Sequence, residues 1–200
     1  MVIYLTQKAI KALDIKEKLI DINDDRVKNA SAEDIWYCNT LELFRDIIDL
    51  FFVHEQTLFN FPMFIDESPA LEHYIRNTWL SVMMLYSVPP KQIDKFMVTS
   101  QNMYFVKGGG NKSLLSVMNE MKLTYQLSVD DCYEKNKSPD IPWEEITLNV
   151  NSNLHKAKYI GSDYVTPEEL FVERYGGKTK GRFSRRISNT GGPPDLRLLK

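Results

Sequence analysis

The chain has 200 residues, of which 43% are apolar and 12% are aromatic. This size and this apolar content are sufficient for a buried core, so the composition excludes a wholly disordered protein. The longest apolar stretch, residues 47–65, is interrupted by charged and polar residues and by Pro62, which makes it unsuited to crossing a membrane. The apolar run at the amino terminus is too short for a secretory signal. We therefore expect a soluble protein without a membrane span.

The two cysteines, Cys38 and Cys132, lie far apart in the chain and form no CxxC or Cys/His spacing. Without a secretory signal, this pattern predicts reduced thiols in a cytoplasmic protein. A disulfide between them is the less favoured alternative.

Charge is unevenly distributed along the chain. From Gly176 onward there are seven basic residues and one acidic residue, a net charge of +6, whereas the whole chain has a net charge of -2. Residues 1–175 therefore carry a net charge of -8. This split predicts a single acidic domain over residues 1–175, followed by a basic, glycine- and proline-containing tail over residues 176–200.

The first predicted elements are a strand over residues 2–5 and a helix capped by Thr6 that runs to about Leu13. The polar, unpatterned segment 21–33 is predicted to be a surface loop. A further strand is expected over residues 35–39. These elements place a strand, a helix and a second strand in the first fifth of the chain.

A β-hairpin is predicted from two aromatic-rich runs, residues 47–53 and 57–65, separated by the three-residue loop 54–56. Pro62 lies within the second run and has no amide hydrogen to donate. Because such a residue cannot complete a central ladder, we expect this strand at the edge of the sheet or at a bulge.

The middle of the chain is predicted to be mostly helical. Ser68 and Pro69 are typical of a helix start, and apolar residues then recur at helical spacing over residues 69–86. A shorter helix is expected around residues 93–97. A strand is then predicted over residues 102–107, and the three glycines that follow are expected to end it.

The clearest helix pattern begins after those glycines. Its apolar residues fall at positions i, i+4, i+7 and i+11: Leu114, Met118, Met121 and Tyr125. A loop over residues 130–142, a strand over residues 146–150 and a last helix from Thr166 to about Arg174 complete the predicted elements. The order of elements favours an α+β fold with a mostly antiparallel sheet of five or six strands and three or four packed helices.

Several motifs resemble those of a family of small proteins of unknown function from bacteria, plasmids and phages. The shared motifs are Leu5-Thr6-Gln7-Lys8, Trp36-Tyr37-Cys38-Asn39, the hairpin around residues 52–59, and Asn111-Lys112-Ser113-Leu114-Leu115-Ser116-Val117-Met118-Asn119-Glu120. Leu114 departs from the valine that family members usually have at that position. Leu148-Asn149 and the segment from Tyr159-Ile160-Gly161 through Pro167 to Phe171 match more loosely. The resemblance covers about residues 1–175 and implies no reaction, cofactor or substrate.

The best site candidate is the start of the helix at Asn111. Three glycines followed by Asn111, Lys112 and Ser113 bring backbone amides, the positive end of a helix dipole and a lysine together, which favours an anion. Ser116 and Asn119 continue the polar stripe from Lys112, and the resemblance adds Gln7 and Lys8 as further candidates for anion or partner binding. The alternative is that Ser113 caps the helix, the glycines form a turn, and Asn119 satisfies a neighbouring backbone group.

No assembled catalytic or metal-binding set can be recognised in the sequence. The three histidines, His54, His73 and His155, lack partners at ligand spacing. Neither cysteine lies beside a basic cluster or a glycine elbow. We therefore predict no metal, no cofactor and no catalytic residue, and we favour a non-enzymatic protein.

The basic tail is the second site candidate. Its contact residues are expected to be Lys178, Lys180, Arg182, Phe183, Arg185 and Arg186. Such a segment can neutralise phosphates and stack a base, or it can bind an acidic protein surface. The alternative is a solubilising extension.

The first functional hypothesis is a non-enzymatic interaction protein of a mobile element or its host. It would bind a protein partner and inhibit or regulate a macromolecular complex, for example a defence system. The second hypothesis is a protein, with or without enzymatic activity, that binds nucleic acid or nucleotides through residues 111–119 and the tail.

Overall fold

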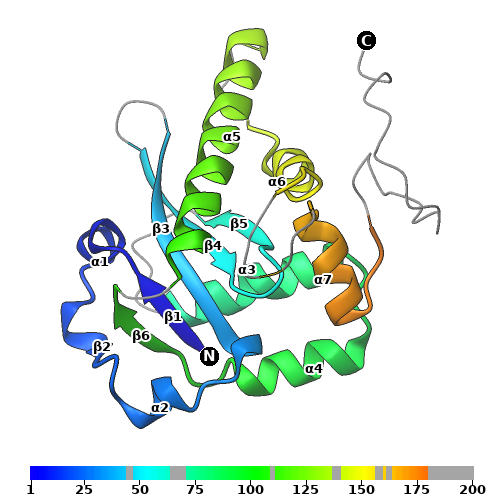
Figure 1. The fold of residues 1–200 in the computed structure, drawn as a ribbon. Coiled ribbons are helices and arrows are strands. Elements are labelled where there is room, and N and C mark those ends of the chain that lie inside the picture. Colours follow the sequence, from blue (N-terminus) through cyan, green and yellow to red (C-terminus); the bar gives the residue numbers. More distant parts are fainter. Residues whose placement is uncertain are drawn as a thin grey trace.

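The computed structural model describes residues 1–43, 47–63, 71–108, 111–136, 141–155, 160 and 164–179. Over these residues the chain forms a six-stranded sheet with helices on both faces (Figure 1). This arrangement confirms the predicted α+β class. In the part of the chain that the structure describes, no helix is both long and apolar enough to cross a membrane.

The strands of the sheet lie in the order β2-β6-β1-β3-β4-β5. Their bounds are Val2–Leu5 for β1, Leu19–Ile20 for β2, Ile35–Leu43 for β3, Ile47–His54 for β4, Asn60–Met63 for β5 and Tyr104–Lys107 for β6. Strand β1 is parallel to both β3 and β6, and β2 is parallel to β6. Strand β4 is antiparallel to both β3 and β5. The sheet is therefore mixed, and the prediction of a mostly antiparallel sheet is wrong.

The parallel half of the sheet depends on pairings between distant segments. Val2 lies opposite Ile35 on one side and opposite Tyr104 on the other. Parallel neighbours need a crossover connection, which helices and loops supply here, whereas antiparallel neighbours need only a tight turn. Only the hairpin half of the sheet therefore has a local signal in the sequence.

The described residues form seven α-helices, more than the three or four predicted. Their bounds are Gln7–Leu13 for α1, Asp25–Lys28 for α2, Leu71–Leu85 for α3, Pro90–Thr99 for α4, Lys112–Asn136 for α5, Trp143–Asn151 for α6 and Pro167–Tyr175 for α7. Two short 3₁₀ helices, Lys16–Lys18 (η1) and Ala32–Asp34 (η2), lie in the connections.

Helix α6 occupies the segment predicted as a strand over residues 146–150, so that prediction is wrong. Its buried residues are Ile146, Thr147, Val150 and Asn151, a spacing that puts them on one side of a helix. This side packs against α5 and β5. A five-residue segment fits the strand and the helix period almost equally well, and contact with two neighbouring elements favours the helix.

Two predicted loops also contain helix. Helix α5 continues to Asn136, well into the loop predicted over residues 130–142. Helix α2 lies inside the loop predicted over residues 21–33, where the Asp24 side chain accepts a hydrogen bond from the Arg26 amide and Val27 is buried. Val27 packs against the sheet beside Val2 and Val106, and this contact explains why so polar a segment is ordered.

Several local predictions are confirmed. Thr6 caps α1 by accepting a hydrogen bond from the Ala9 amide, and α3 spans most of the helix predicted over residues 69–86. The predicted start of α3 at Ser68 and Pro69 lies outside the described residues. Strands β4 and β5 form the predicted hairpin, and Pro62 lies on the edge strand β5. The turn spans residues 55–59 rather than the predicted 54–56.

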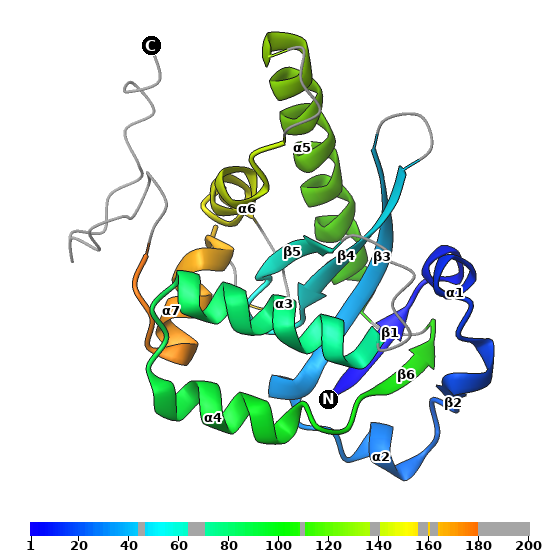
Figure 2. The ribbon, with the colours of Figure 1, turned by 180° about the vertical axis from the view of Figure 1, so that it is seen from behind.

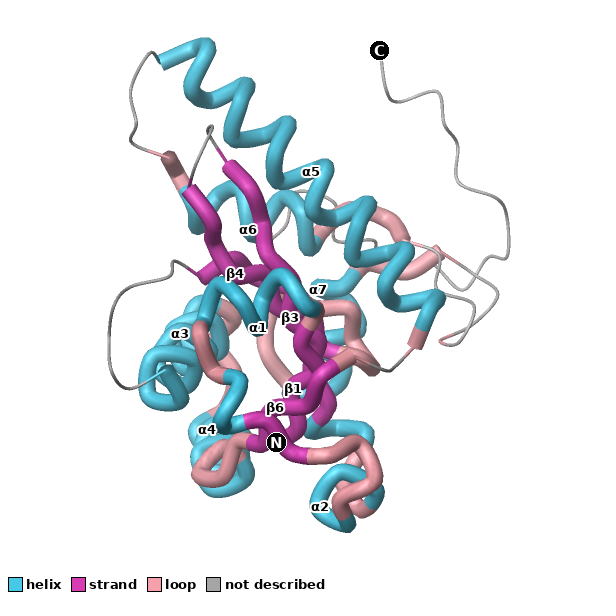
Figure 3. Tube along the Cα trace, turned by 90° about the vertical axis from the view of Figure 1, so that its left-hand side faces the viewer, coloured by secondary structure: helices cyan, strands magenta, loops and turns pink. Residues whose placement is uncertain are grey.

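Different helices cover the two faces of the sheet. Figure 3 shows α3 and α4 on one side of the strands and α5 on the other. Buried residues of α1 belong to the same cluster as those of α3 and α4, and buried residues of α6 belong to the same cluster as those of α5. The cluster on the first face is rich in aromatic side chains, and Phe171 of α7 belongs to it. The second face packs against apolar residues of α5 and α6, which lie across it. Figure 2 shows α3, α4 and α7 side by side in front of the sheet.

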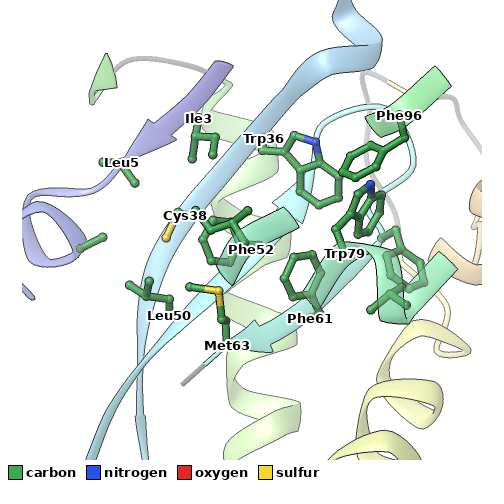
Figure 4. Close-up of a cluster of buried hydrophobic side chains, with 14 of the residues drawn as sticks. Ile3, Leu5, Trp36, Cys38, Leu50, Phe52, Phe61, Met63, Trp79 and Phe96 are labelled. Carbon is green, nitrogen blue, oxygen red and sulfur yellow. The ribbon is translucent and has the colours of Figure 1, made fainter. Parts of the chain in front are cut away.

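Trp79 of α3 lies at the centre of the aromatic face. Its ring packs 4.3 Å from that of Trp36, 5.5 Å from that of Phe61 and 5.6 Å from that of Phe96, measured between centroids. Figure 4 shows these side chains clustered beside the aliphatic residues of β1 and β4. The cluster joins α3 and α4 to the sheet and fixes the position of the amino-terminal end of β3, where Trp36 lies.

Residues 176–178, which directly follow α7, contact the rest of the fold. Gly176 ends α7 in the left-handed conformation with φ 72°, as glycine commonly does at this position. A Cβ atom on Gly177 would lie 2.7 Å from the carbonyl oxygen of Tyr86, so only glycine fits this position without a shift. The Lys178 amide donates a hydrogen bond to the same carbonyl at 2.7 Å. These contacts hold the start of the predicted tail against the connection between α3 and α4.

Candidate functional site

The start of α5, the first predicted site, is capped from within the protein. The Asn111 side-chain oxygen accepts hydrogen bonds from the amides of Ser113 at 3.1 Å and Leu114 at 3.3 Å. The Asn111 amide donates to the Tyr37 hydroxyl at 3.1 Å, and this hydroxyl donates to Glu55 at 3.3 Å. Three of the amides at this helix start therefore already have protein partners, and the capping residue is Asn111 rather than Ser113.

Replacing Asn111 with alanine is expected to destabilise the protein by about 1 kcal/mol, because two amides of α5 lose their acceptor. Ser113→Ala is the matched control, and its effect should stay within about 0.5 kcal/mol. Urea unfolding followed by far-UV circular dichroism measures both values. A Ser113→Ala effect as large as that of Asn111→Ala would show that the Ser113 hydroxyl contributes to the cap.

The stripe formed by Lys112, Ser116 and Asn119 is exposed to solvent. It lines neither the cleft described below nor the small cavity beside Trp36 and Trp79, and the rest of the described fold does not cover it. At helical spacing the stripe continues through Leu123 and Leu127 to Asp130 and Glu134, all of them exposed. In the following text these seven residues are called the outer stripe of α5.

The other predicted site residues lie in several places. Gln7 and Lys8 are exposed on α1, and Lys8 forms an ion pair with Glu42 of β3 at 2.7 Å. The Glu42 carbonyl also accepts a hydrogen bond from Gln126, so Lys8 lies near the middle of α5. Lys178 is described, whereas the other predicted tail contacts are outside the described residues: Lys180, Arg182, Phe183, Arg185 and Arg186. The described residues thus bring Lys8 near α5, and they include only the first four residues of the tail.

A second candidate site is a cleft of about 780 Å³ that the sequence did not predict. It lies at the amino-terminal end of β3, near Trp36, and the turn after β4 lines it as well. Helices α4 and α7 form its sides, and η2 forms part of its rim. Large concave sites of this size are where proteins most often bind small ligands.

The floor of the cleft is aromatic. Trp36 and Phe96 are buried and line the cleft, and Tyr175 lines it from α7. Burial raises the pKa of the Tyr175 hydroxyl well above its usual range, so this ring stays neutral. Figure 4 shows Trp36 and Phe96 at the same end of the aromatic cluster, next to Trp79. The cleft therefore opens directly onto the main core.

His54 fixes the backbone on two sides of the cleft. Its Nε2 atom lies 3.0 Å from the Glu33 carbonyl, and its Nδ1 atom lies 2.9 Å from the Thr57 hydroxyl. Because a carbonyl can only accept, Nε2 carries the hydrogen, and the Thr57 hydroxyl donates to Nδ1. Burial lowers the pKa of His54 to about 4, so the ring is neutral at physiological pH. His54 is therefore a structural residue that joins η2 to the β4–β5 turn.

Charged side chains form the rim of the cleft. Glu33 pairs with Lys95 of α4 at 3.3 Å and also with Arg174 of α7. Desolvation raises the pKa of Glu33, but the two cations outweigh it and hold that pKa below its ordinary value. This ion triad links three elements that are far apart in the sequence.

The cleft escaped sequence analysis because its residues come from separate segments. Glu33 belongs to η2 and Trp36 to β3. Lys95 and Phe96 belong to α4, and Arg174 belongs to α7. None of these segments has a motif of its own. Only the pairing of β4 with β3 and the packing of α4 and α7 bring them together.

Neither candidate site has the features of a metal centre or of a thiol nucleophile. Among the residues that the structure describes, no group of three His, Cys, Asp or Glu side chains is placed to hold a metal ion. Both cysteines are free, and Cys38 is buried in the sheet. Burial raises the pKa of the Cys38 thiol far above its usual range, which disfavours the reactive thiolate.

Comparison with known proteins places the chain in a family. No curated protein matches it. The sequence model described as "Domain of unknown function (DUF6933)" matches residues 2–170, which span all of the sheet and most of the helices. The match excludes the end of α7 and the basic segment after it. The chain therefore belongs to the DUF6933 family.

Proposed function

We propose that this protein is a non-enzymatic interaction protein that binds a protein partner through the outer stripe of α5. The observation that carries the proposal is the exposure of two leucines in the middle of that stripe. Leu123 is 55% exposed and Leu127 is 60% exposed, one helical turn apart. Single exposed apolar residues are common, but an adjacent pair on one helix face is typical of a surface that packs into an apolar groove.

The position of α5 supports this use. Its inner side carries Leu114, Met118, Met121 and Tyr125, all buried against the sheet, so the helix is held firmly. Its carboxyl-terminal end projects beyond the sheet in Figures 1 and 2. A helix anchored on one side and projecting at one end can present its other side to a large partner.

The charges of the outer stripe also support binding rather than helix stability. Lys112 lies at the amino-terminal end of α5, where the helix dipole favours negative charge. Asp130 and Glu134 lie near the carboxyl-terminal end, where the dipole favours positive charge. For Lys112 and Glu134, which lie in the first and last turns of α5, this placement costs the helix about 0.3–1 kcal/mol each, whereas Asp130 lies before the last turn. A partner with acidic residues facing Lys112 and basic residues facing Asp130 and Glu134 would compensate for this cost.

The test is quantitative capture of the partner from the native host with the full chain as bait. We expect a stoichiometric protein partner for the unaltered chain, and at least a tenfold loss of affinity for Leu123→Glu/Leu127→Glu, because two central apolar contacts are removed. Leu154→Glu is the matched control, since Leu154 is 43% exposed but lies outside α5. Its binding should equal that of the unaltered chain.

Two outcomes would contradict the proposal. One is capture of the same partner, with unchanged affinity, by the double variant. The other is a chain that remains a lone monomer in the native host while the phenotype it causes there is intact. Thermal unfolding of each variant, expected to lie within a few degrees of the unaltered chain, separates loss of binding from loss of fold.

The finer parts of the proposal are its setting and its consequence. We infer a cytoplasmic location, which the two free cysteines support because thiols stay reduced there. An origin on a mobile element, with inhibition or regulation of a host complex such as a defence system, is supported by the resemblance of residues 1–175 to phage and plasmid proteins. Identification of the captured partner tests both.

Nucleic-acid binding is the second candidate function, favoured by the exposure of Lys112 and by the seven basic residues that follow Gly176. In that case the captured material would be RNA or DNA, and binding would weaken steeply with salt. Lys112→Ala or removal of residues 180–200 would reduce it, whereas Leu123→Ser/Leu127→Ser, which adds no charge to the stripe, would not. A protein partner gives a different pattern, because substitution of the two leucines would then cause a large loss of binding.

A further inference from the structure

The cleft at the edge of the sheet carries an inference that is independent of the proposed role of α5. Residues of η2, α4 and α7 line it, and no residue of α5 does. Its volume of about 780 Å³ is large enough for a small organic molecule. The chemistry of its walls indicates which class of molecule fits.

The walls of the cleft have an excess of negative charge. Among the described side chains that line it, four are carboxylates and two are cations. The carboxylates are Glu33, Asp34, Glu55 and Glu173, and the cations are Lys95 and Arg174. Both cations are already paired with Glu33. Counting also the Met1 ammonium, which donates to the Thr99 and Asn102 carbonyls, the lining still has a net charge of -1.

The interior of the cleft favours an apolar stem. Trp36, Phe96 and Tyr175 present aromatic surface at its floor, while the carboxylates lie toward the rim. Thr57, Thr99 and Gln92 add uncharged hydrogen-bonding groups. Aromatic side chains together with carboxylates attract alkyl cations, both through ring quadrupoles and through direct ion pairing.

We propose that this cleft binds an organic cation, an alkylammonium or alkylguanidinium group whose apolar stem lies against Trp36 and Tyr175. The cationic end would lie toward Glu173, since Asp34 already attracts the Met1 ammonium. The group can belong to a free amine or to a basic side chain of a peptide, since both present the same chemistry. An anion such as phosphate is disfavoured because Lys95 and Arg174 are engaged by Glu33.

Titration calorimetry of the full chain with agmatine and with the tripeptide Gly-Arg-Gly tests this proposal. We expect at least one of the two probes to bind with a dissociation constant of about 1 mM or lower at low salt. Either result supports the cation site, and the ratio of the two affinities assigns the source. Glu173→Gln should weaken binding about threefold, and Glu173→Lys about tenfold. Glu120→Gln, exposed on α5, is the control and should change nothing.

The proposal is overturned by any of three results. The first is that neither probe binds at a probe concentration of about 10 times the expected dissociation constant. A probe binds, but Glu173→Lys leaves its affinity unchanged. Adenosine monophosphate binds more tightly than both probes, and Lys95→Ala abolishes its binding. Because none of these experiments alters Leu123 or Leu127, their failure is distinguishable from failure of the proposed function.

Discussion

Replacing Trp79 with alanine is expected to lower the free energy of unfolding by about 4 kcal/mol, the largest effect of any single substitution considered for this fold. The side chain is 1% exposed and packs against rings from β3, β5 and α4. It also packs against Phe171 of α7, 5.6 Å away between centroids. Truncation would leave a cavity where four elements meet, because their backbones cannot all move inward.

The measurement is urea unfolding followed by intrinsic fluorescence and circular dichroism. Met84→Ala is the matched control, because Met84 lies on the same helix but is 65% exposed, and its effect should be within about 0.5 kcal/mol. Trp79→Phe keeps an aromatic ring and should lose about 2 kcal/mol, which keeps the test usable if the alanine variant does not fold. Equal losses for Trp79→Ala and Met84→Ala would contradict the central role of this side chain.

The helices that the sequence predicted well are those with one long apolar side. In α3 the buried residues Ile75, Trp79 and Val82 recur at helical spacing, and in α5 Leu114 and Met118 do the same over several turns. Such long periodic segments have a single consistent interpretation. The hairpin was predictable for a related reason, since its two strands are neighbours in the chain and Pro62 indicates the edge.

The mixed sheet and α6 could not be predicted because the deciding contacts are not local. Nothing near Val2 indicates that it pairs with Ile35 and Tyr104 in parallel. In α6 the conformation is decided partly by Asn151, whose side chain accepts from the Asn60 amide at 3.0 Å and donates to the Asn60 carbonyl at 2.8 Å. This buried amide pair fixes a helix onto the edge strand, and each asparagine alone resembles an ordinary loop residue.

The candidate sites show the same division. The outer stripe of α5 was visible in the sequence as far as Asn119, because helical spacing alone places Lys112, Ser116 and Asn119 on one side. Its extension to Leu123 was not visible, since an exposed and a buried leucine look alike in a sequence. The cleft required the positions of Glu33 and Arg174 relative to each other, which only the tertiary fold defines.

The second large effect concerns a buried acid in the sheet. Asp49 of β4 is 1% exposed, lies opposite Leu41 of β3, and one of its carboxylate oxygens has no hydrogen-bond partner among the described residues. Burial raises the pKa of Asp49 from 3.8 to about 6. The folded protein therefore holds this proton more tightly than the unfolded chain does. The contribution of Asp49 to the free energy of unfolding is fully present below about pH 4, declines as the pH rises toward 6, and is lost above it.

Asp49→Asn is accordingly expected to stabilise the protein above pH 7 and to have almost no effect at pH 4. Raising the pKa from 3.8 to about 6 corresponds to about 3 kcal/mol, and because the asparagine amide must itself be buried, we expect a gain of about 2 kcal/mol. Urea unfolding of both proteins between pH 4 and pH 8 measures the difference, in which the titration of His54 and of other common groups cancels. Asp94→Asn, which replaces an exposed acid on α4, is the control for the substitution itself. A gain that is equal at pH 4 and pH 8 would mean that the substitution acts through packing and not through the charge of Asp49.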